Sequence, residues 1–458
     1  MKGETLTQKL HLLWRAGFGP ALEQIPIIDK SNIKDLYRSL TKPQKFQPVN
    51  FQKPEQPTED AYNPMDNAEK RKQAQKLNRS QNLDLNIDFM NQMILSEAQL
   101  NEKMAFFWHG HFASRSVNPR FSKQLLNSIR RHALGNFKDL LFAVSQSPSM
   151  LNFLNNQQNK KGHPNENFAR EVMELFTMGR GNYTETDVRE GARAFTGWAY
   201  NKQGEFIERK NQHDTGEKTF LGKKGNFSGE DVLHIILEKK ETARFITEKI
   251  YKFFVNEKVD EARVQELSSI FYQTNYDIRK LMDSIFLSNW FYEAQHMGNR
   301  IKSPIELMVG MMRILPMQVA HPENLIDYQR LLGQMLLYPP NVAGWPNGKA
   351  WIDSSTLMLR LQMPQIWTGL RPMDYDAPLD DDLDMGTKNK NSNLRQFKTP
   401  QIEIAWNQVN DTFKDKKLVD YILQSPNKSV QQVASRFADE GIKMNMINLM
   451  STPEYQLM

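Results

Sequence analysis

The fold is decided by the stretch Glu102-Lys103-Met104-Ala105-Phe106-Phe107-Trp108-His109-Gly110-His111-Phe112. A helical pattern that starts near residue 67 ends here in three consecutive aromatic residues, and two histidines follow directly. Aromatic residues at this density indicate a packed interior, and histidines are frequent in chemical sites. We therefore expect a mostly α-helical protein whose main polar site is built around residues 108–112.

Helical periodicity continues through most of the chain. It predicts further helices at 5–17, 32–40, 123–134, 137–145, 166–178, 185–195, 231–238, 241–254, 261–274, 277–288, 304–314, 325–336 and 354–361. One strand pattern interrupts it, where Phe206-Ile207-Glu208 and Lys218–Leu221 flank a polar turn. The predicted fold is a mostly α, multi-helix orthogonal bundle with one small β-hairpin at about 205–221.

Changes in composition divide the chain into five segments. N-terminal helices cover 1–41, and an extended Pro/Gln-rich connection follows at 42–66. The main helical domain spans 67–371. The acidic and polar segment 372–398 is interpreted as a flexible linker. Residues 399–458 are predicted to form a small C-terminal helical cap.

Composition also excludes several classes of protein. Hydrophobic residues make up 39% of 458 residues, which is sufficient for a packed core. The net charge of +6 comes without a Lys/Arg-only run or a known nucleic-acid module, so we expect no nucleic-acid partner. Cysteine is absent, which removes disulfides and thiolate metal sites. No apolar stretch is long enough for a membrane span.

His109 and His111 form an HxH pair, a frequent chelate for zinc, iron or manganese. Two residues apart they cannot share one face of a regular helix, but an extended or helix-terminal backbone could bring both into one site, and Gly110 eases such a break. Glu102 lies two turns earlier and could be a metal ligand itself or a carboxylate that orients the imidazole. The alternative is structural: His109 caps the helix end and His111 packs on Trp108.

The segment 165–179 carries a second group of polar residues. Asn167, Glu171 and Glu174 share one helix face, with Arg170 beside them. Near an HxH pair, these carboxylates could complete a metal site with Glu171 as ligand, or act as a general acid and base. The alternative is ion pairing, either of Glu166 with Arg170 or of Glu171 and Glu174 with Arg193.

Two further segments carry candidate residues. His213 and Asp214 lie on the turn of the predicted hairpin, which could fold over the site and add His213 as a metal ligand, with Asp214 beside it. A turn favours Asp for local hydrogen bonding alone. Trp345 and Trp351 lie in the segment 339–351, and we interpret them as buried anchors of a rigid loop, the alternative being an exposed platform for carbohydrate or peptide.

Several blocks in order resemble the domain-of-unknown-function 1800 family. The resemblance is carried by His11–Pro20, Glu102–Phe112, Asn165–Gly179, Ala192–Trp198, His213-Asp214, Phe220-Leu221-Gly222, Lys302-Ser303-Pro304 and Pro339–Pro346. It implies a bacterial protein, often exported to the periplasm and encoded beside a sulfatase-like protein, which is the expected partner. The N-terminus lacks the apolar core of a signal peptide, which indicates a cytoplasmic location unless a leader has been removed.

Two hypotheses of function remain open. In the first, the protein is a metal-dependent hydrolase or oxidoreductase with His109, His111, Glu171 and His213 at a divalent metal and with catalytic roles for Glu171, Glu174, Arg170 and Arg193. In the second, these residues form a buried structural network in a binding or scaffold protein. Motifs of nucleotide hydrolysis, Rossmann cofactor binding and zinc proteolysis are all missing from the sequence.

Overall fold

The computed structural model describes residues 4–51, 68–373, 400–424, 432 and 440–458. The prediction of a mostly α-helical fold is confirmed. The expected connection at 42–66 and the expected linker at 372–398 lie largely outside the described residues. In the described part of the chain, no helix has the length and apolarity that crossing a membrane requires.

Most helices begin at residues with good capping side chains, such as Thr5, Asn118, Thr184, Ser228 and Ser303. The helices of the N-terminal half are α1 (Leu6–Arg15), α2 (Ile25–Ile28), α3 (Ile33–Leu40), α4 (Ala68–Leu95), α5 (Gln99–His111), α6 (Pro119–His132), α7 (Phe137–Ser145), α8 (Pro148–Phe153), α9 (Asn167–Glu171), α10 (Glu185–Ala194) and α11 (Gly229–Leu237). Those that follow are α12 (Lys240–Phe254), α13 (Glu261–Gln273), α14 (Ile278–Phe286), α15 (Pro304–Ile314), α16 (Asn324–Leu331), α17 (Ser354–Trp367), α18 (Trp406–Phe413), α19 (Leu418–Ile422) and α21 (Gly441–Met450).

The described residues form three two-stranded antiparallel sheets, and the predicted hairpin is not one of them. Strands do form at β2 (Phe206–Glu208) and β3 (Lys218–Phe220), but they do not pair with each other. Instead β2 pairs with β1 (Trp198–Tyr200), and β3 pairs with β4 (Lys223–Gly225). The prediction was wrong about the pairing because Trp198–Tyr200 offered a nearer partner that sequence periodicity did not reveal.

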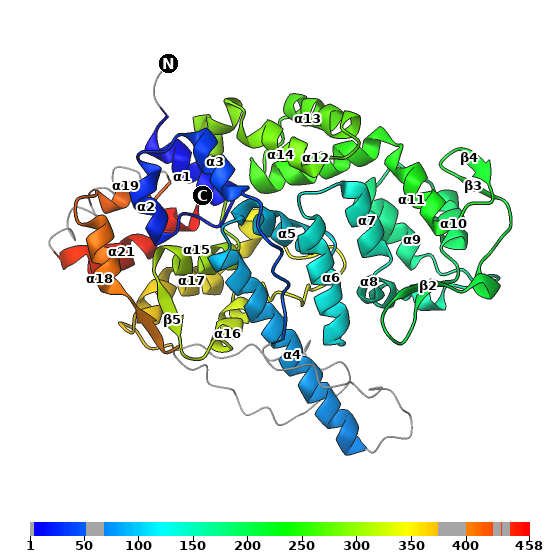
Figure 1. The fold of residues 1–458 in the computed structure, drawn as a ribbon, viewed down its shortest axis with the longest axis horizontal. Coiled ribbons are helices and arrows are strands. Elements are labelled where there is room, and N and C mark those ends of the chain that lie inside the picture. Colours follow the sequence, from blue (N-terminus) through cyan, green and yellow to red (C-terminus); the bar gives the residue numbers. More distant parts are fainter. Residues whose placement is uncertain (1–3, 52–67, 374–399, 425–431, 433–439) are drawn as a thin grey trace.

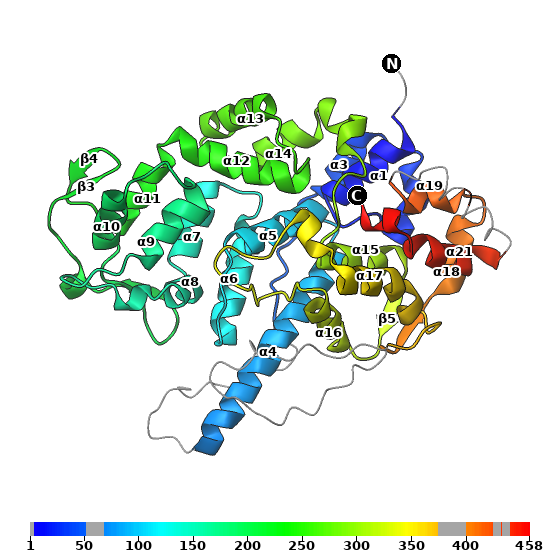
Figure 2. The ribbon, with the colours of Figure 1, turned by 180° about the vertical axis from the view of Figure 1, so that it is seen from behind.

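Helix α5 lies near the middle of the molecule (Figures 1 and 2). It is buried on all sides, since every residue from Gln99 to His111 except Asn101 and Gly110 is shielded from solvent. α6 packs on it, and the long helix α4 packs against both α6 and α15. A helix buried on all sides is typical of the centre of a large core, and the charged residues of α5 are therefore expected to have partners there.

The C-terminal segment is joined to the main helical domain by backbone pairing. Strand β6 (Ile402–Ile404) pairs with β5 (Met317–Val319), and Ile301 bridges to Leu457. At the last residue, the Met458 N–H donates to the Arg300 carbonyl at 2.8 Å. α21 also packs on α17. These contacts place the end of the chain directly beside residues 300–304.

A buried carboxylate lies at the junction of these parts. Glu306, on the first turn of α15, pairs with Lys103 of α5 at 2.6 Å and with Arg300 at 3.0 Å, and it is completely shielded from solvent. The Ser303 N–H also donates to it at 2.8 Å. Burial alone would raise the pKa of Glu306, but the charges of Arg300 and Lys103 outweigh burial and hold this pKa well below its usual range.

A second buried pair fixes α5 to α6. Glu102 accepts two hydrogen bonds from the Arg130 guanidinium, each 2.8 Å long, and both side chains are at most 5% exposed. Such a bidentate pair has a strict geometry, so it sets the angle between the two helices. Glu102, expected to orient a histidine, is thus engaged with Arg130.

We predict that Glu306→Gln lowers the free energy of unfolding by about 3–5 kcal/mol, because Lys103 and Arg300 would stay buried without a counter-charge. Denaturant unfolding followed by circular dichroism measures this change. Glu185→Gln is the control, since Glu185 makes an exposed ion pair with Arg170 and its loss should leave the midpoint nearly unchanged. Equal effects of the two substitutions would contradict the structural role given to Glu306.

Candidate functional site

His109 points from α5 toward the loop that follows α16. Its Nε2 accepts a hydrogen bond from the Leu337 N–H at 3.1 Å, and its ring lies 5.3 Å from that of Trp345. Burial lowers the pKa of His109 to about 4, so the ring is neutral near pH 7. In this position His109 holds the loop that carries Trp345 against α5.

His111 makes its contacts with other segments. Its Nε2 lies 3.1 Å from the Phe176 carbonyl and its Nδ1 lies 3.3 Å from Lys249 Nζ, so the hydrogen-bond pattern assigns the ring proton to Nε2. Its ring also packs edge-on against Trp108, with centroids 5.4 Å apart, which is the structural alternative predicted for it. Burial first, and the charge of Lys249 second, lower the pKa of His111.

The two histidines therefore bind different parts of the molecule. α5 stays helical through His111, so the break expected at Gly110 does not occur. Residues two apart on a regular helix point in nearly opposite directions. His109 consequently faces Leu337 and Trp345, whereas His111 faces Phe176 and Lys249.

The carbonyl of Gly110 lies directly beneath a second glycine, Gly344, whereas a Cβ on Gly110 itself would meet no atom within 4 Å. A Cβ on Gly344 would come 2.4 Å from the Gly110 carbonyl oxygen, a distance that no side chain tolerates. Gly344 also has a φ of +86°, in the left-handed region that favours glycine. The segment 339–351 can therefore lie directly on the backbone of α5.

The helix predicted at 166–178 changes its hydrogen bonding halfway along. After α9 it continues as a π-helical turn, Val172–Thr177, in which the Met178 N–H donates to the Met173 carbonyl at 2.8 Å. Such turns are rare in proteins overall, and those that do occur are often found at functional sites. The carbonyls near its end face Lys249, whose Nζ donates to Leu175 at 2.9 Å.

Asn167, Arg170 and Glu174 of this helix bind partners other than the two histidines. Glu174 accepts from Arg180 at 2.5 Å and from Tyr183 at 2.9 Å. Arg170 pairs with Glu166 at 3.2 Å, as predicted, and with Glu185 at 2.7 Å. Asn167 donates to the Leu154 carbonyl at 3.3 Å. These contacts are those of a partly exposed ion-pair network.

Glu171 differs from its neighbours, because the described residues give its carboxylate neither a hydrogen bond nor an ion pair. It is half-buried, and its pKa is raised first by burial and second by the charge of Glu174. A carboxylate with a raised pKa can exchange protons nearer to neutral pH.

The remaining candidates gather around the segment between β2 and β3. Arg193 pairs with Asp214 at 2.9 Å and with Glu190 at 3.0 Å rather than with Glu171 or Glu174. The guanidinium of Arg193 lowers the pKa of Asp214 to about 2. His213 bonds to the Thr196 carbonyl through Nδ1 at 2.9 Å. Arg193, Asp214 and His213 thus form one cluster, which fastens this segment to α10.

The positions of the histidines and carboxylates can be compared with the metal site expected from the sequence. Among the residues described, no three His, Asp or Glu side chains come close enough together to hold a metal ion. His109 accepts from a backbone N–H, and both ring nitrogens of His111 have partners. The site residues do not fit a metal in this arrangement. The zinc, iron or manganese site stays a prediction.

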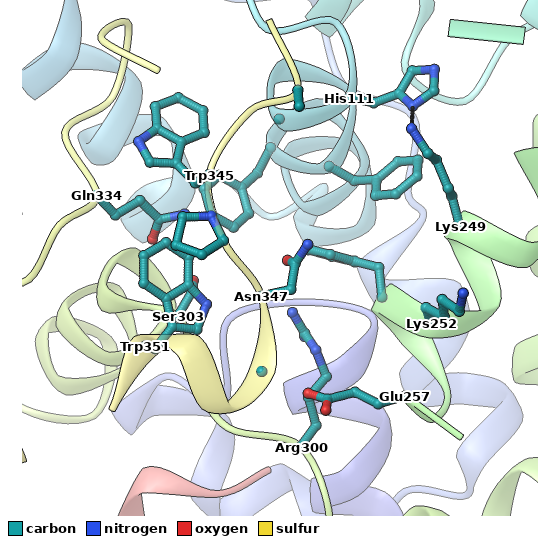
Figure 3. A pocket seen from close by; sticks show the side chains of 17 residues that line it. His111, Lys249, Lys252, Glu257, Arg300, Ser303, Gln334, Trp345, Asn347 and Trp351 are labelled. Carbon is teal, nitrogen blue, oxygen red and sulfur yellow. Dashed lines mark hydrogen bonds between the residues drawn. The ribbon is translucent and has the colours of Figure 1, made fainter. Parts of the chain in front are cut away.

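A cavity of about 460 Å³ opens where α5, α12, Arg300 and the segment 343–351 meet (Figure 3). This size is within the range of small-molecule sites. Its aromatic walls are Phe106, Phe107, Phe253, Trp345 and Trp351, and we call the cavity with these walls the cleft. The two tryptophans are 9% and 4% exposed, which confirms that they are buried anchors, although both also line the cleft.

Charged groups lie at both ends of the cleft. His111 and Lys249 are at one end and Arg300 and Glu257 at the other, with Asn347 between them (Figure 3). Burial, with a smaller contribution from Lys252, lowers the pKa of Lys249 to about 8. Among the described residues no carboxylate pairs with Lys249, whose partners are the neutral His111 ring and a carbonyl.

Arg300 brings a further positive charge to the cleft. One of its nitrogens pairs with Glu306, and its guanidinium lies 4.3 Å over the Phe253 ring. Lys252, also on the lining, pairs with Glu248 at 2.6 Å. The sequence prediction of site residues included none of Lys249, Lys252, Glu257 and Arg300, because each occurs alone outside a recognisable motif.

Comparison with known proteins gives a family but no activity. A family model described as a protein of unknown function, DUF1800, matches residues 11–457. Neither the curated proteins nor the solved structures contain a match.

We predict that Gly344→Ala destabilises the protein by more than about 2 kcal/mol and changes the fluorescence of Trp345, because the new methyl group overlaps the Gly110 carbonyl. Gly181→Ala is a matched control: Gly181 has the same φ of +86°, and its Cβ would meet no atom within 4 Å. In the control, backbone strain alone should lower the free energy of unfolding, by about 1 kcal/mol. Urea unfolding of both variants measures the difference, and equal losses would refute the close contact.

Proposed function

The chain belongs to the DUF1800 family of proteins of unknown function, and we propose that it binds a small molecule carrying an anionic group in the cleft. The observation that carries this proposal is the lining itself, in which Lys249, Lys252 and Arg300 face a cavity with aromatic walls. An anion entering the cleft would gain charge-assisted hydrogen bonds in surroundings of low dielectric constant.

The two ends of the cleft suit different parts of such a ligand. Lys249 offers an ammonium whose present partners are neutral, so binding an anion costs it no ion pair. At the other end, Glu257 offers an acceptor for a hydroxyl or amine group of the ligand. The rings of Phe107, Phe253 and Trp351 provide apolar surface for the body of the ligand.

Binding is the function that these contacts support, and catalysis would need a further group. A half-buried lysine with a pKa near 8 is able to take part in proton transfer, but proton transfer alone does not define a reaction. The metal-dependent hydrolase or oxidoreductase, export and the sulfatase-like partner stay predictions from the sequence and its resemblance.

We predict that the cleft distinguishes anionic molecules from matched neutral ones. Glucuronate should bind more tightly than glucose, and phenyl phosphate more tightly than benzyl alcohol, as measured by isothermal titration calorimetry. Removing one buried charge partner should weaken binding of the anion about tenfold or more, so Lys249→Met is expected to have this effect.

Lys258→Gln is the control for this experiment. Lys258 follows Glu257 in the sequence and is exposed, but it does not line the cleft, so its replacement should leave affinity unchanged. Thermal melting of both variants shows whether Lys249→Met still folds. If neutral and anionic molecules bind equally, or if Lys258→Gln weakens binding as much as Lys249→Met, the proposal is wrong.

A further inference from the structure

The interior around Glu306 contains more positive than negative charge. Five cationic side chains interact electrostatically with Glu306 and are at most 6% exposed: Arg15, Lys103, Arg300, Lys302 and Arg360. The exposed carboxylate of Glu257 also acts on Arg15. One buried side-chain carboxylate, that of Glu306, therefore lies among five buried cations, and burial of unpaired charge is costly.

Only two of the five cations pair with Glu306 directly. Lys103 and Arg300 lie at ion-pair distance, whereas the partners of Lys302 and Arg360 are neutral. Lys302 Nζ donates to the Tyr455 carbonyl at 2.6 Å and lies 3.7 Å over the Trp14 ring. Arg360 donates through one nitrogen to the Lys302 carbonyl at 3.0 Å.

The rest of the Arg360 guanidinium has no acceptor. Its side chain is 0% exposed, and no described residue accepts a hydrogen bond from its Nε or Nη2. Two neighbours share this condition, since the Tyr455 hydroxyl and the Gln456 amide are buried without partners. Lys302 connects this turn to Arg360, because its carbonyl accepts from Arg360 Nη1 and its N–H donates to the Gln456 carbonyl at 2.8 Å.

Arg313 is a useful comparison within the same helical domain. It is equally buried, at 6% exposed, but all three of its guanidinium nitrogens donate, to Gly19, Ile94 and Gln24. Protein oxygens thus accept a hydrogen bond from each of the three guanidinium nitrogens of Arg313. Arg360 lies in a different kind of site, in which the donors outnumber the acceptors.

Charge decides what such a site can hold. Water could accept the free hydrogen bonds, but it cannot neutralise a guanidinium, which keeps its proton in proteins. A deprotonated Lys302 would remove one charge, and burial does lower the pKa of Lys302 well below its usual range. Arg360 and Arg15 would still be charged.

We infer that the protein binds a small inorganic anion of the size of chloride between Arg360 and the C-terminal turn, with Arg360 Nε and Nη2, the Tyr455 hydroxyl and the Gln456 amide as donors. The anion is small because none of these three residues lines the cleft and each is at most 3% exposed. Because the site joins α17 to residues 455–456, the anion would stabilise the docked C-terminal end.

Bromide provides the direct test, since it replaces chloride and scatters anomalously. Crystals of the full chain soaked in bromide should show an anomalous peak at hydrogen-bond distance from Arg360 Nε or Nη2. Peaks confined to the surface would overturn the inference.

Solution measurements test the same site independently. At constant ionic strength, replacing gluconate by chloride should raise the melting temperature of the wild-type protein, and Arg360→Met should abolish this response. Arg313→Met is the matched control, because it should lower the melting temperature while keeping the chloride response. If the wild type melts equally in both salts, or if both variants respond alike, no specific anion is bound at Arg360. Should Arg360→Met fail to fold, the bromide experiment still decides.

Discussion

The contact of Glu306 with Lys103 and Arg300 is the constraint on which the rest of the structure depends. It joins the central helix α5 to the start of α15, and all three side chains are buried. Arg300 connects this contact to the cleft, because the side chain that binds Glu306 also lines the cleft. The backbone of Arg300 is in addition hydrogen-bonded to Met458. The ion pairs of Glu306 thus link the packing of α5 and α15 to the cleft and to the C-terminal residues.

The segment that ends α5 connects the two walls of the cleft. His109 holds the Trp345 loop and His111 holds the π-helical turn, while the missing side chain of Gly344 lets its backbone touch the Gly110 carbonyl. A pair of histidines that looks like a chelate in the sequence acts here as two separate anchors. Their neutrality follows from burial, which lowers the pKa of both rings.

Periodicity predicted the helices well, because a buried face repeats every 3.6 residues whatever its partner. It predicted strands at 206–208 and 218–221 but not their pairing, which depends on neighbours whose short strands carry no periodic signal. For the site, sequence predicted that Trp345 and Trp351 are buried, which the structure confirms. It missed Lys249 and Arg300, since a single lysine in an amphipathic helix is usually solvated, and only the tertiary fold shows that this one is enclosed.

The most direct test of a positively charged cleft is the quenching of its tryptophans by iodide relative to neutral acrylamide. Subtracting the signal of a Trp345→Phe/Trp351→Phe variant from that of the wild type isolates the two cleft residues from the other six tryptophans. Our account predicts a higher iodide-to-acrylamide ratio for the cleft pair than for the remaining six, because Lys249, Lys252 and Arg300 attract the anion. A ratio equal to or below that of the other tryptophans would contradict it.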